Sequence, residues 1–223
     1  MTRETPHMAS GSQTKAGDAT EFLPGAGFHF LTPVYEFLAR PMLGRVWRDV
    51  VGDVASVARP AASVVDLGCG PATVLHRLAR LRPDLSLTGI DIDERMLSIA
   101  RRRLPHARLL QGSIDAVPIE DQSADVVISS MVLHHLERPI KQGAFREAKR
   151  ILKPDGQFLL CDFSVPVNKR GEWLVRWFGK LEHGVARQGS GELQEIAASE
   201  ALTMAPRWTR LGCITQHEIT MGV

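Results

Sequence analysis

Two acidic residues stand beside apolar runs where they could hold a ligand. Asp66 lies just before the turn Gly68-Cys69-Gly70 in the run VVDLGCGPA, and Asp91 belongs to a second run, TGIDID. Glycine permits positive φ angles and has no β-carbon, so a ligand can lie against the backbone of such a turn. An ionised acid at the end of the next strand can accept hydrogen bonds from both hydroxyls of a ribose. The two features together predict a site for a nucleoside-containing ligand.

Other interpretations of these residues are open at this point. A dinucleotide site would follow the pattern G-x-G-x-x-G, and Thr73 stands where its third glycine belongs, which disfavours a nicotinamide-dependent oxidoreductase. The turn could also serve the fold alone. Asp91 could cap a helix, although Asp93 is better placed to cap a helix that begins at Glu94. Cys69 is expected to be a small packing residue and not a nucleophile.

A histidine pair supplies candidate proton-transfer groups. His134 and His135, in MVLHHLERP, come soon after an apolar run at 124–129 that is expected to be a strand. An ordinary histidine pKa near 6.5 suits proton transfer at neutral pH. Asp162, at the end of FLLCDF, is a candidate to orient a histidine or to bind a substrate hydroxyl. The alternative is that the histidines only shape the pocket and that Asp162 is an ordinary carboxylate at a strand end.

The elements that must position these residues alternate between strands and helices. Alternating strands and helices require crossover connections, which produce a parallel sheet covered on both faces. The expected fold is therefore α/β: a doubly wound, mostly parallel, Rossmann-like sheet with helices on both faces and an N-terminal helical cap. A turn is expected at Lys153-Pro154-Asp155-Gly156. Strands are expected at 63–67, 85–91, 107–111, 124–129, 157–163 and 212–223, the last a candidate antiparallel strand, and helices at 71–81, 94–104 and 139–152.

The chain is expected to form one domain over residues 25–223, after a disordered tail at 1–24. Residues 25–59 are interpreted as the helical cap, with Pro33 and Pro41 in the first turns of short helices. A segment at 164–190 has the spacing of an amphipathic helix with basic flanks. Such a helix either packs over the pocket or associates weakly with a membrane surface.

Composition excludes several classes of function. The 27 basic and 25 acidic residues give a net charge of +2, without the concentrated basic footprint of a nucleic-acid-binding protein. The arginine run at 101–103 is interpreted as a solvated helix end. The three cysteines have neither metal-site spacing nor a disulfide framework, which suits a cytoplasmic protein without a metal. No apolar run approaches the roughly 20 residues of a membrane helix, and the N-terminus has no signal-peptide core.

Four motifs taken together resemble one enzyme family. VVDLGCGPA, TGIDID, LLQGSIDAVPIEDQSADVVISSMVLHHL and ILKPDGQFLLCDF resemble, in order and spacing, the motifs of class I S-adenosylmethionine-dependent methyltransferases over about residues 30–221. The resemblance is to the small-molecule branch that includes the ubiquinone and menaquinone C-methyltransferases. FLTPVYEFL resembles the aromatic opening of that branch, with Tyr35-Glu36 in place of the usual Tyr-Asp pair. The resemblance implies methyl transfer from S-adenosylmethionine to a small-molecule acceptor, planar or lipophilic, by in-line displacement.

The resemblance also implies a role for individual residues. Asp91 would bind the ribose hydroxyls and Ile92 would pack on the adenine. Many relatives carry an aspartate at the position of Ser113, so the contact with the adenine amino group falls here to Ser113, to the backbone or to Asp115. Tyr35 would donate a hydrogen bond to the methionine carboxylate. The residues implied to line the cofactor are Tyr35, Asp66, Gly68, Cys69, Gly70, Asp91, Ile92, Gly112, Ser113, Ile114, Ser129 and Ser130.

The resemblance also implies that two variable segments select the substrate. They are the cap, with Phe28, Phe30, Tyr35, Phe37 and Trp47, and the insert, with Trp173, Trp177 and Phe178.

Two further hypotheses are weighed against small-molecule methylation. A DNA amino-methyltransferase would carry an Asn/Asp-Pro-Pro-aromatic run where this chain reads ISSMVLHH, which disfavours a nucleic-acid substrate. The alternative from another class is a catalytically silent S-adenosylmethionine-binding module that acts as a regulator or assembly partner.

Overall fold

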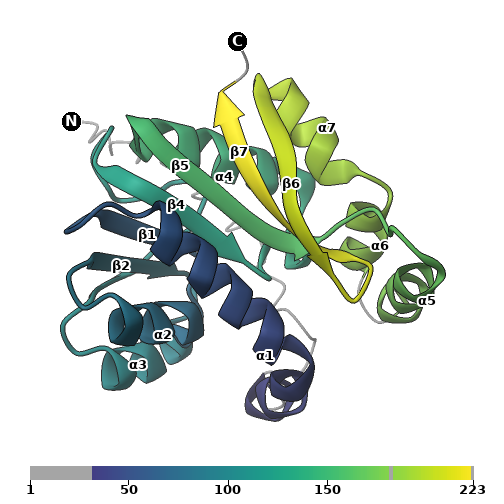
Figure 1. Ribbon diagram of the computed structural model, residues 1–223, viewed down its shortest axis with the longest axis horizontal. Coiled ribbons are helices and arrows are strands. Elements are labelled where there is room, and N and C mark those ends of the chain that lie inside the picture. Colours follow the sequence, from purple (N-terminus) through teal and green to yellow (C-terminus); the bar gives the residue numbers. More distant parts are fainter. Residues whose placement is uncertain (1–31, 181–182, 222–223) are drawn as a thin grey trace, which may run out of the picture.

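A seven-stranded sheet forms the centre of the protein (Figure 1). The computed structural model describes residues 32–180 and 183–221, with side chains from residue 43 to 220 of these ranges. The first five strands in spatial order are parallel, and β7 runs antiparallel to both β5 and β6. The order is β3 (Arg108–Gln111), β2 (Ser86–Asp91), β1 (Ser63–Leu67), β4 (Ala124–Ser130), β5 (Leu152–Phe163), β7 (Ile214–Met221) and β6 (Leu202–Arg210).

Helices cover both faces of the sheet, as the sequence predicted. Adjacent residues of one strand enter opposite cores, for example Val64 and Val65 of β1, because side chains of a strand alternate between its faces. One core packs against α1 (Thr32–Val57), α2 (Thr73–Leu81) and α3 (Glu94–Arg103), and the other packs against α4 (Arg138–Ile151) and α7 (Glu192–Ser199). A 3-10 helix, η1 (Leu133–His135), follows β4, and α5 (Lys169–Phe178) and α6 (His183–Gly189) follow β5. The predicted doubly wound, mostly parallel fold is confirmed.

The start of α3 follows the predicted capping chemistry. The Asp93 carboxylate accepts a hydrogen bond from the Arg95 amide at 2.8 Å, which satisfies one of the unpaired N–H groups of the first turn. The start of α2 differs from the prediction. Ala72 precedes the helix in the left-handed conformation, with φ of 59°, so Pro71 belongs to the glycine turn and not to the first helical turn.

The N-terminal helix is longer than predicted. The helix α1 is continuous from Thr32 to Val57 and includes Pro41, so the expected short helices are one element. Its buried stripe includes Val46, Val50 and Val54, which recur at helical spacing. Phe28 and Phe30 lie outside the described residues, as do the side chains of Tyr35 and Phe37.

The sequence missed four elements and misplaced one turn. The strand β6, the 3-10 helix η1 and the helices α6 and α7 were not predicted. The segment 153–156, predicted to be a turn, lies within β5. The β4–β5 pairing passes from Ala124 opposite Leu152 to Val126 opposite Gln157, so the extra residues form a bulge. Among the described helices, none has the length and apolar character needed to cross a bilayer.

Candidate active site

The candidate site lies where the strand order reverses. β1 pairs with β2 on one side and with β4 on the other, and ligands of doubly wound sheets bind at the carboxyl ends of such strands. There the glycine turn follows β1, Asp91 ends β2, and Ser130 ends β4 (Figure 1). The topology therefore brings the predicted ligand-binding residues to one edge of the sheet.

The glycine turn needs glycine for two different reasons. The amides of Gly68 and Cys69 both donate to the carbonyl of Ile90, at 2.8 and 2.9 Å, which fixes the turn against β2. Gly68 has φ of +78°, and a β-carbon there would lie 2.6 Å from a methyl group of Val132. Gly70 has φ of +53°, but a β-carbon there would meet no atom within 4 Å. The backbone at Gly70 therefore faces open space in which a ligand can lie.

Asp66 is a buried acid with an unsatisfied oxygen. Its residue is 2% exposed, and its Oδ1 atom has no hydrogen-bond partner among the described residues. Burial, and next to it the charge of Asp91, raises the pKa of Asp66 from 3.8 to about 8. Buried polar atoms are normally paired, so a missing partner indicates a ligand or water at this position. A cationic donor such as an ammonium group fits both the free oxygen and the raised pKa.

Asp91 retains the capacity to bind two hydroxyl groups. Its Oδ2 accepts from the Gly70 amide at 2.7 Å and its Oδ1 accepts from the Asp93 amide at 2.9 Å. An ionised carboxylate has about four acceptor positions, so each oxygen keeps one of them. Burial raises the pKa of Asp91, and the hydrogen bonds from the amides of Asp93 and Gly70 limit that rise. Asp93, and not Asp91, caps the following helix.

The residues predicted to contact an adenine divide into exposed and buried groups. Ile92 is 42% exposed directly after β2, an unusual position for an isoleucine and a suitable surface for a planar ring. The Gly112 amide donates to the Asp91 carbonyl at 3.0 Å. The Ser113 hydroxyl donates to the Asp115 carboxylate, which links the two candidates for the adenine contact. Ile114 is buried in the core beneath them.

Three small residues around the turn have distinct environments. Cys69 is buried, and burial raises the pKa of its thiol, so the side chain is a packing group. Its sulfur would lie 2.7 Å from a β-carbon at Gly89, which explains the glycine in β2. The Ser129 hydroxyl donates to the Leu67 carbonyl at 2.9 Å and ties β4 to β1. The Ser130 hydroxyl is buried without a described partner and remains available to a ligand.

Asp162 holds His134 in place at the end of β5. Its Oδ1 accepts from the Phe163 amide and lies 2.7 Å from Nδ1 of His134, and its Oδ2 accepts from the Val132 and Leu133 amides at 3.2 and 2.8 Å. Burial acts to raise the pKa of Asp162, but His134 and these hydrogen bonds outweigh it, so the pKa lies below 3.8. With its acceptor positions used, Asp162 can orient the histidine but has no position left for a substrate hydroxyl.

The two histidines differ in access. His134 is 2% exposed, and a β-carbon on Gly184 of α6 would lie 1.5 Å from its carbonyl oxygen, so α6 packs directly on η1. The ring centroids of His134 and His135 are 3.9 Å apart, and His135 is partly exposed. His135 is therefore the member of the pair that solvent or a ligand can reach directly.

Sequence reasoning missed two contributions to this edge of the sheet. Arg103, assigned to a solvated helix end, donates to the Pro71 carbonyl at 2.9 Å and so braces the glycine turn. His217 of β7 is buried near Asp162, and burial lowers its pKa to about 4. The antiparallel pairing of β7 with β5, which puts Thr215 opposite Asp162, could not be read from the chain alone.

The insert after β5 contains the predicted amphipathic helix, α5. Phe178 packs against Phe163 with ring centroids 6.0 Å apart, as expected of a residue near the pocket. Trp173 and Trp177 are 60% and 49% exposed. Phe178 therefore packs against the core, and the two tryptophans face outward, which leaves membrane association open as the alternative for this helix.

Comparison with known proteins supports the family suggested by the motifs. Residues 64–156 match the family model described as a methyltransferase domain. The chain is 38% identical to an uncharacterised 37.1 kDa protein in transposon TN4556 of Streptomyces fradiae over 55% of this chain and 36% of that protein. It is 28% identical to the ubiquinone/menaquinone biosynthesis C-methyltransferase UbiE of Vibrio parahaemolyticus over 75% of this chain and 66% of the relative. The chain thus spans from about a third to about two thirds of the length of these relatives.

A solved structure extends the likeness to the fold. A SAM-dependent methyltransferase from Aquifex aeolicus superposes with a TM-score of 0.57 at 17% identity, covering 78% of this chain and 88% of that chain. At this identity the likeness concerns the fold alone. Residues 64–156 are thus similar to a methyltransferase-domain family, and the chain resembles the ubiquinone/menaquinone C-methyltransferases in sequence.

Proposed function

We propose that this chain binds S-adenosylmethionine at the Gly68–Gly70 turn and transfers its methyl group to a planar or lipophilic small molecule. The observation that carries the proposal is the unpartnered, buried Oδ1 of Asp66 beside a turn that is open at Gly70. An ammonium group placed there would donate to that oxygen and compensate the charge that burial disfavours. A neutral ligand would leave the buried carboxylate unpaired.

The neighbouring residues suit the nucleoside half of the same ligand. Asp91 has one acceptor position left on each oxygen for two ribose hydroxyls, and the exposed Ile92 offers an apolar surface to an adenine ring. The unpartnered Ser130 hydroxyl adds a polar group at the methionine end. Side-chain chemistry along this edge thus changes from acidic to apolar in the order that the cofactor requires.

When bound, S-adenosylmethionine supplies a methyl group that is already activated on a sulfonium. The residues of this chain then have to hold the acceptor in line with that methyl and exclude water. The rings of Phe163 and Phe178 pack on each other at the carboxyl end of β5 and make the neighbouring core apolar, which favours a planar or lipophilic acceptor.

An acceptor that carries a proton, such as a phenol, an alcohol or a ring carbon, also needs a base. We assign this role to His135, which is partly exposed next to the buried His134. The hydrogen bond that His134 Nδ1 donates to Asp162 fixes His134, and the 3.9 Å ring contact lets His134 position His135. Asp162 and His134 then act as positioning residues.

Calorimetric titration tests the cofactor assignment. S-adenosylmethionine and its demethylated product should bind with micromolar affinity, and NAD should not bind. Asp91→Ala should weaken binding at least about thirtyfold, because two hydrogen bonds to a charged acceptor are lost. Asp93→Ala, a matched loss of an acid that only caps α3, should keep the affinity within about threefold. Tight NAD binding would refute the assignment, and cofactor binding without turnover across an acceptor screen would identify a silent binding module.

The histidine assignment has its own test on an acceptor found in that screen. His135→Gln should lower kcat by about 100-fold, while cofactor affinity stays unchanged. Asp162→Asn should lower kcat less, because it acts on His135 only through His134. Equal activity of wild type and His135→Gln on a proton-bearing acceptor would exclude His135 as the base.

A further inference from the structure

The helix α5 is fixed to the protein along one side only. A β-carbon on Gly171 would lie 2.1 Å from the carbonyl oxygen of Gly212, so the first turn of α5 presses on the β6–β7 connection. Farther along, Val175 lies against Gly189 of α6, and Phe178 packs on Phe163. These contacts hold the helix firmly and leave its opposite side outward.

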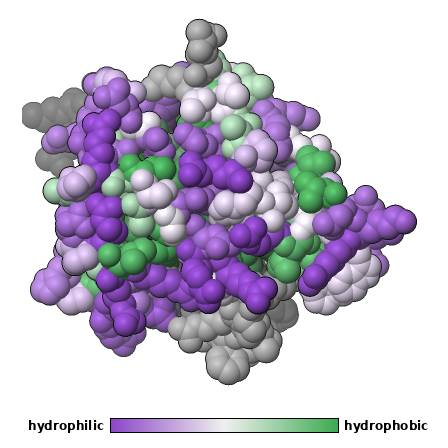
Figure 2. Space-filling model, in the orientation of Figure 1, coloured by the Kyte–Doolittle hydropathy of each residue, from purple (hydrophilic) through white to green (hydrophobic). Residues whose placement is uncertain are grey.

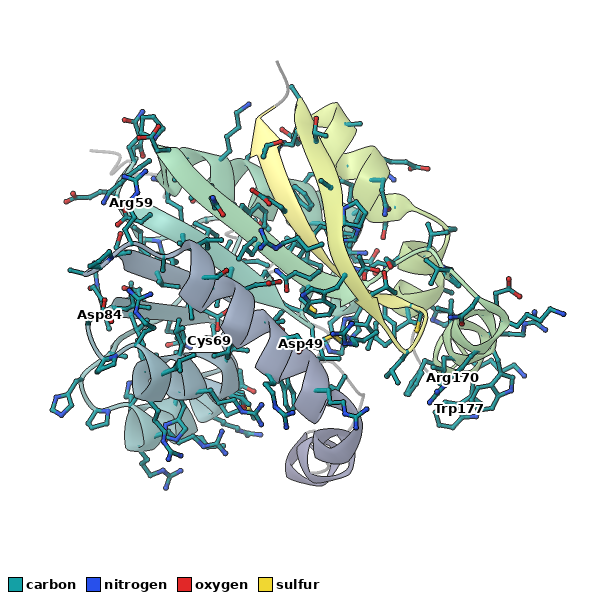
Figure 3. All side chains as sticks on the ribbon, in the orientation of Figure 1. Asp49, Arg59, Cys69, Asp84, Arg170 and Trp177 are labelled. Carbon is teal, nitrogen blue, oxygen red and sulfur yellow. The ribbon has the colours of Figure 1, made fainter. Side chains whose placement is uncertain are left out.

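The outward side carries a stripe in which two cations flank a pair of indoles. Arg170, Trp173 and Trp177 follow at intervals of three and four residues, which places them on one face of α5, and Lys180 follows in the turn just after the helix. The two indole planes differ by 8° with centroids 6.3 Å apart, and both rings are about half exposed. Figure 3 shows Arg170 and Trp177 projecting from α5 away from the sheet, and Figure 2 shows charged side chains around pale rings at this end of the molecule.

Exposed apolar side chains of the described chain concentrate here. Four of the six large hydrophobic residues that are markedly exposed lie between residues 165 and 177. They are Val165, Val167, Trp173 and Trp177. Isolated apolar residues on a surface are ordinary, whereas a local concentration indicates a binding surface.

The charge around the indoles is positive and unpaired. Residues 165–180 contain four basic side chains and one acid, Glu172, a net charge of +3 in a chain whose total is +2. None of the four cations makes an ion pair with another residue that the structure describes. The surface therefore complements a partner that offers negative charge next to an apolar layer.

We propose that this stripe of α5 docks the protein on the surface of an anionic lipid bilayer. Indole rings favour the bilayer interface, where their apolar body and polar N–H are both satisfied, and basic side chains bind the anionic headgroups. The two indoles expose on the order of 250 Å² together. That is well below the roughly 800 Å² that each partner buries in a stable protein complex. The stripe suits weak, reversible contact with lipid better than a protein interface.

Docking through α5 would bring the candidate site close to the membrane. The helix α6 lies between α5 and η1, with Gly184 against the backbone of His134 and Gly179 of the α5 end against Ala186. The surface proposal does not depend on the methyl-transfer proposal. If both hold, a lipophilic acceptor could enter from the bilayer at the carboxyl end of β5.

Vesicle flotation tests the docking proposal with the full chain. Vesicles of about one-third phosphatidylglycerol in phosphatidylcholine should carry the wild-type protein, and pure phosphatidylcholine vesicles should carry much less. Arg170→Gln/Lys180→Gln should weaken binding about thirtyfold, as should NaCl at about 0.5 M. Trp173→Ala/Trp177→Ala should abolish flotation. Leu81→Ala, which removes an equally exposed apolar side chain from α2, is the matched control and should float like wild type.

Two results would overturn the proposal. One is flotation of the tryptophan double variant at the wild-type level, and the other is no flotation of the wild type on the anionic vesicles. In the second case, self-association that disappears with the tryptophans in sedimentation velocity would assign the stripe to a second copy of the chain.

Discussion

Replacing Asp66 with asparagine should stabilise the ligand-free protein at alkaline pH. In the folded protein the pKa of Asp66 is about 8, and its ordinary value is 3.8. Below pH 4 the Asp66 carboxyl is protonated in both the folded and the unfolded chain, so burying it destabilises the fold little. As the pH rises toward 8 the unfolded chain has lost the proton that the folded chain still holds, so stability falls.

The size of the effect follows from the pKa difference. Between pH 5 and pH 8 the free energy of unfolding of the wild type should fall by on the order of 4 kcal/mol through Asp66, since each pH unit contributes about 1.4 kcal/mol. Asparagine has nearly the same shape and no charge to lose. Its unpaired buried amide costs about 1 kcal/mol at every pH. Asp66→Asn should therefore be slightly less stable than wild type at pH 5 and clearly more stable at pH 8.

Thermal unfolding at both pH values measures the effect. For a chain of this length, about 4 kcal/mol corresponds to about 10 °C in Tm. Between pH 5 and pH 8 the Tm of the wild type should therefore fall by about 10 °C more than the Tm of Asp66→Asn. Asp84→Asn is the control: Asp84 is an exposed acid whose pKa Arg82 and the Ala61 amide lower, so its removal should bring no alkaline stabilisation. The reasoning is refuted if Asp66→Asn changes Tm equally at pH 5 and pH 8. Added S-adenosylmethionine should raise Tm in the wild type far more than in Asp66→Asn.

Three further substitutions test separate parts of the structure. Burial lowers the pKa of His217 to about 4, so the stability of the wild type should fall as the pH drops from 6.5 toward 4. His217→Gln should remove about 2 kcal/mol of that loss by pH 5, as measured by urea titration. Gly68→Ala should lower the free energy of unfolding by about 3 kcal/mol, because a β-carbon there is strained at φ of +78° and lies 2.6 Å from a methyl group of Val132. Gly70→Ala should lower it by only about 1 kcal/mol, and equal losses for the two variants in urea would contradict this prediction. The fully buried Lys141 forms an ion pair with Glu192, so Lys141→Met should lower the free energy of unfolding by about 3 kcal/mol, because it leaves the buried Glu192 carboxylate with only the more distant Arg187 guanidinium at 3.8 Å. Lys141→Met/Glu192→Leu should recover most of that loss in the same assay.

The sequence predicted the first five strands well because each signal is local. Buried parallel strands form short apolar runs, and the capping aspartate Asp93 marks the start of α3 without any tertiary information. The last third of the chain lacks such signals. The strand β6 has five exposed positions, Pro206 among them, and it forms because β7 pairs with it and α1 anchors it. Asp53 accepts from the Trp208 indole at 2.7 Å, a contact between residues 155 apart in the chain.

The candidate site divides in the same way. Asp66 and Asp91 could be identified because each stands next to its own strand, and the strands' carboxyl ends meet at one edge. The arrangement of His134 and Asp162 required more. It depends on the β4–β5 register across a bulge and on the path of η1, so the sequence could name the three polar residues but not decide which one is accessible.

The same burial that makes the glycine turn a binding site makes it a weak point of the fold. Two carboxylates stand beside each other at the end of the sheet, and the pKa of each is raised chiefly because burial disfavours its charge. Asp91 recovers part of that cost through two amide hydrogen bonds, whereas one oxygen of Asp66 has no described partner at all. A core selected for stability alone would replace Asp66 with an apolar residue. Its presence at an edge that is open to ligand at Gly70 is best explained by a cation that binds there, which returns on binding the stability that the ligand-free protein lacks.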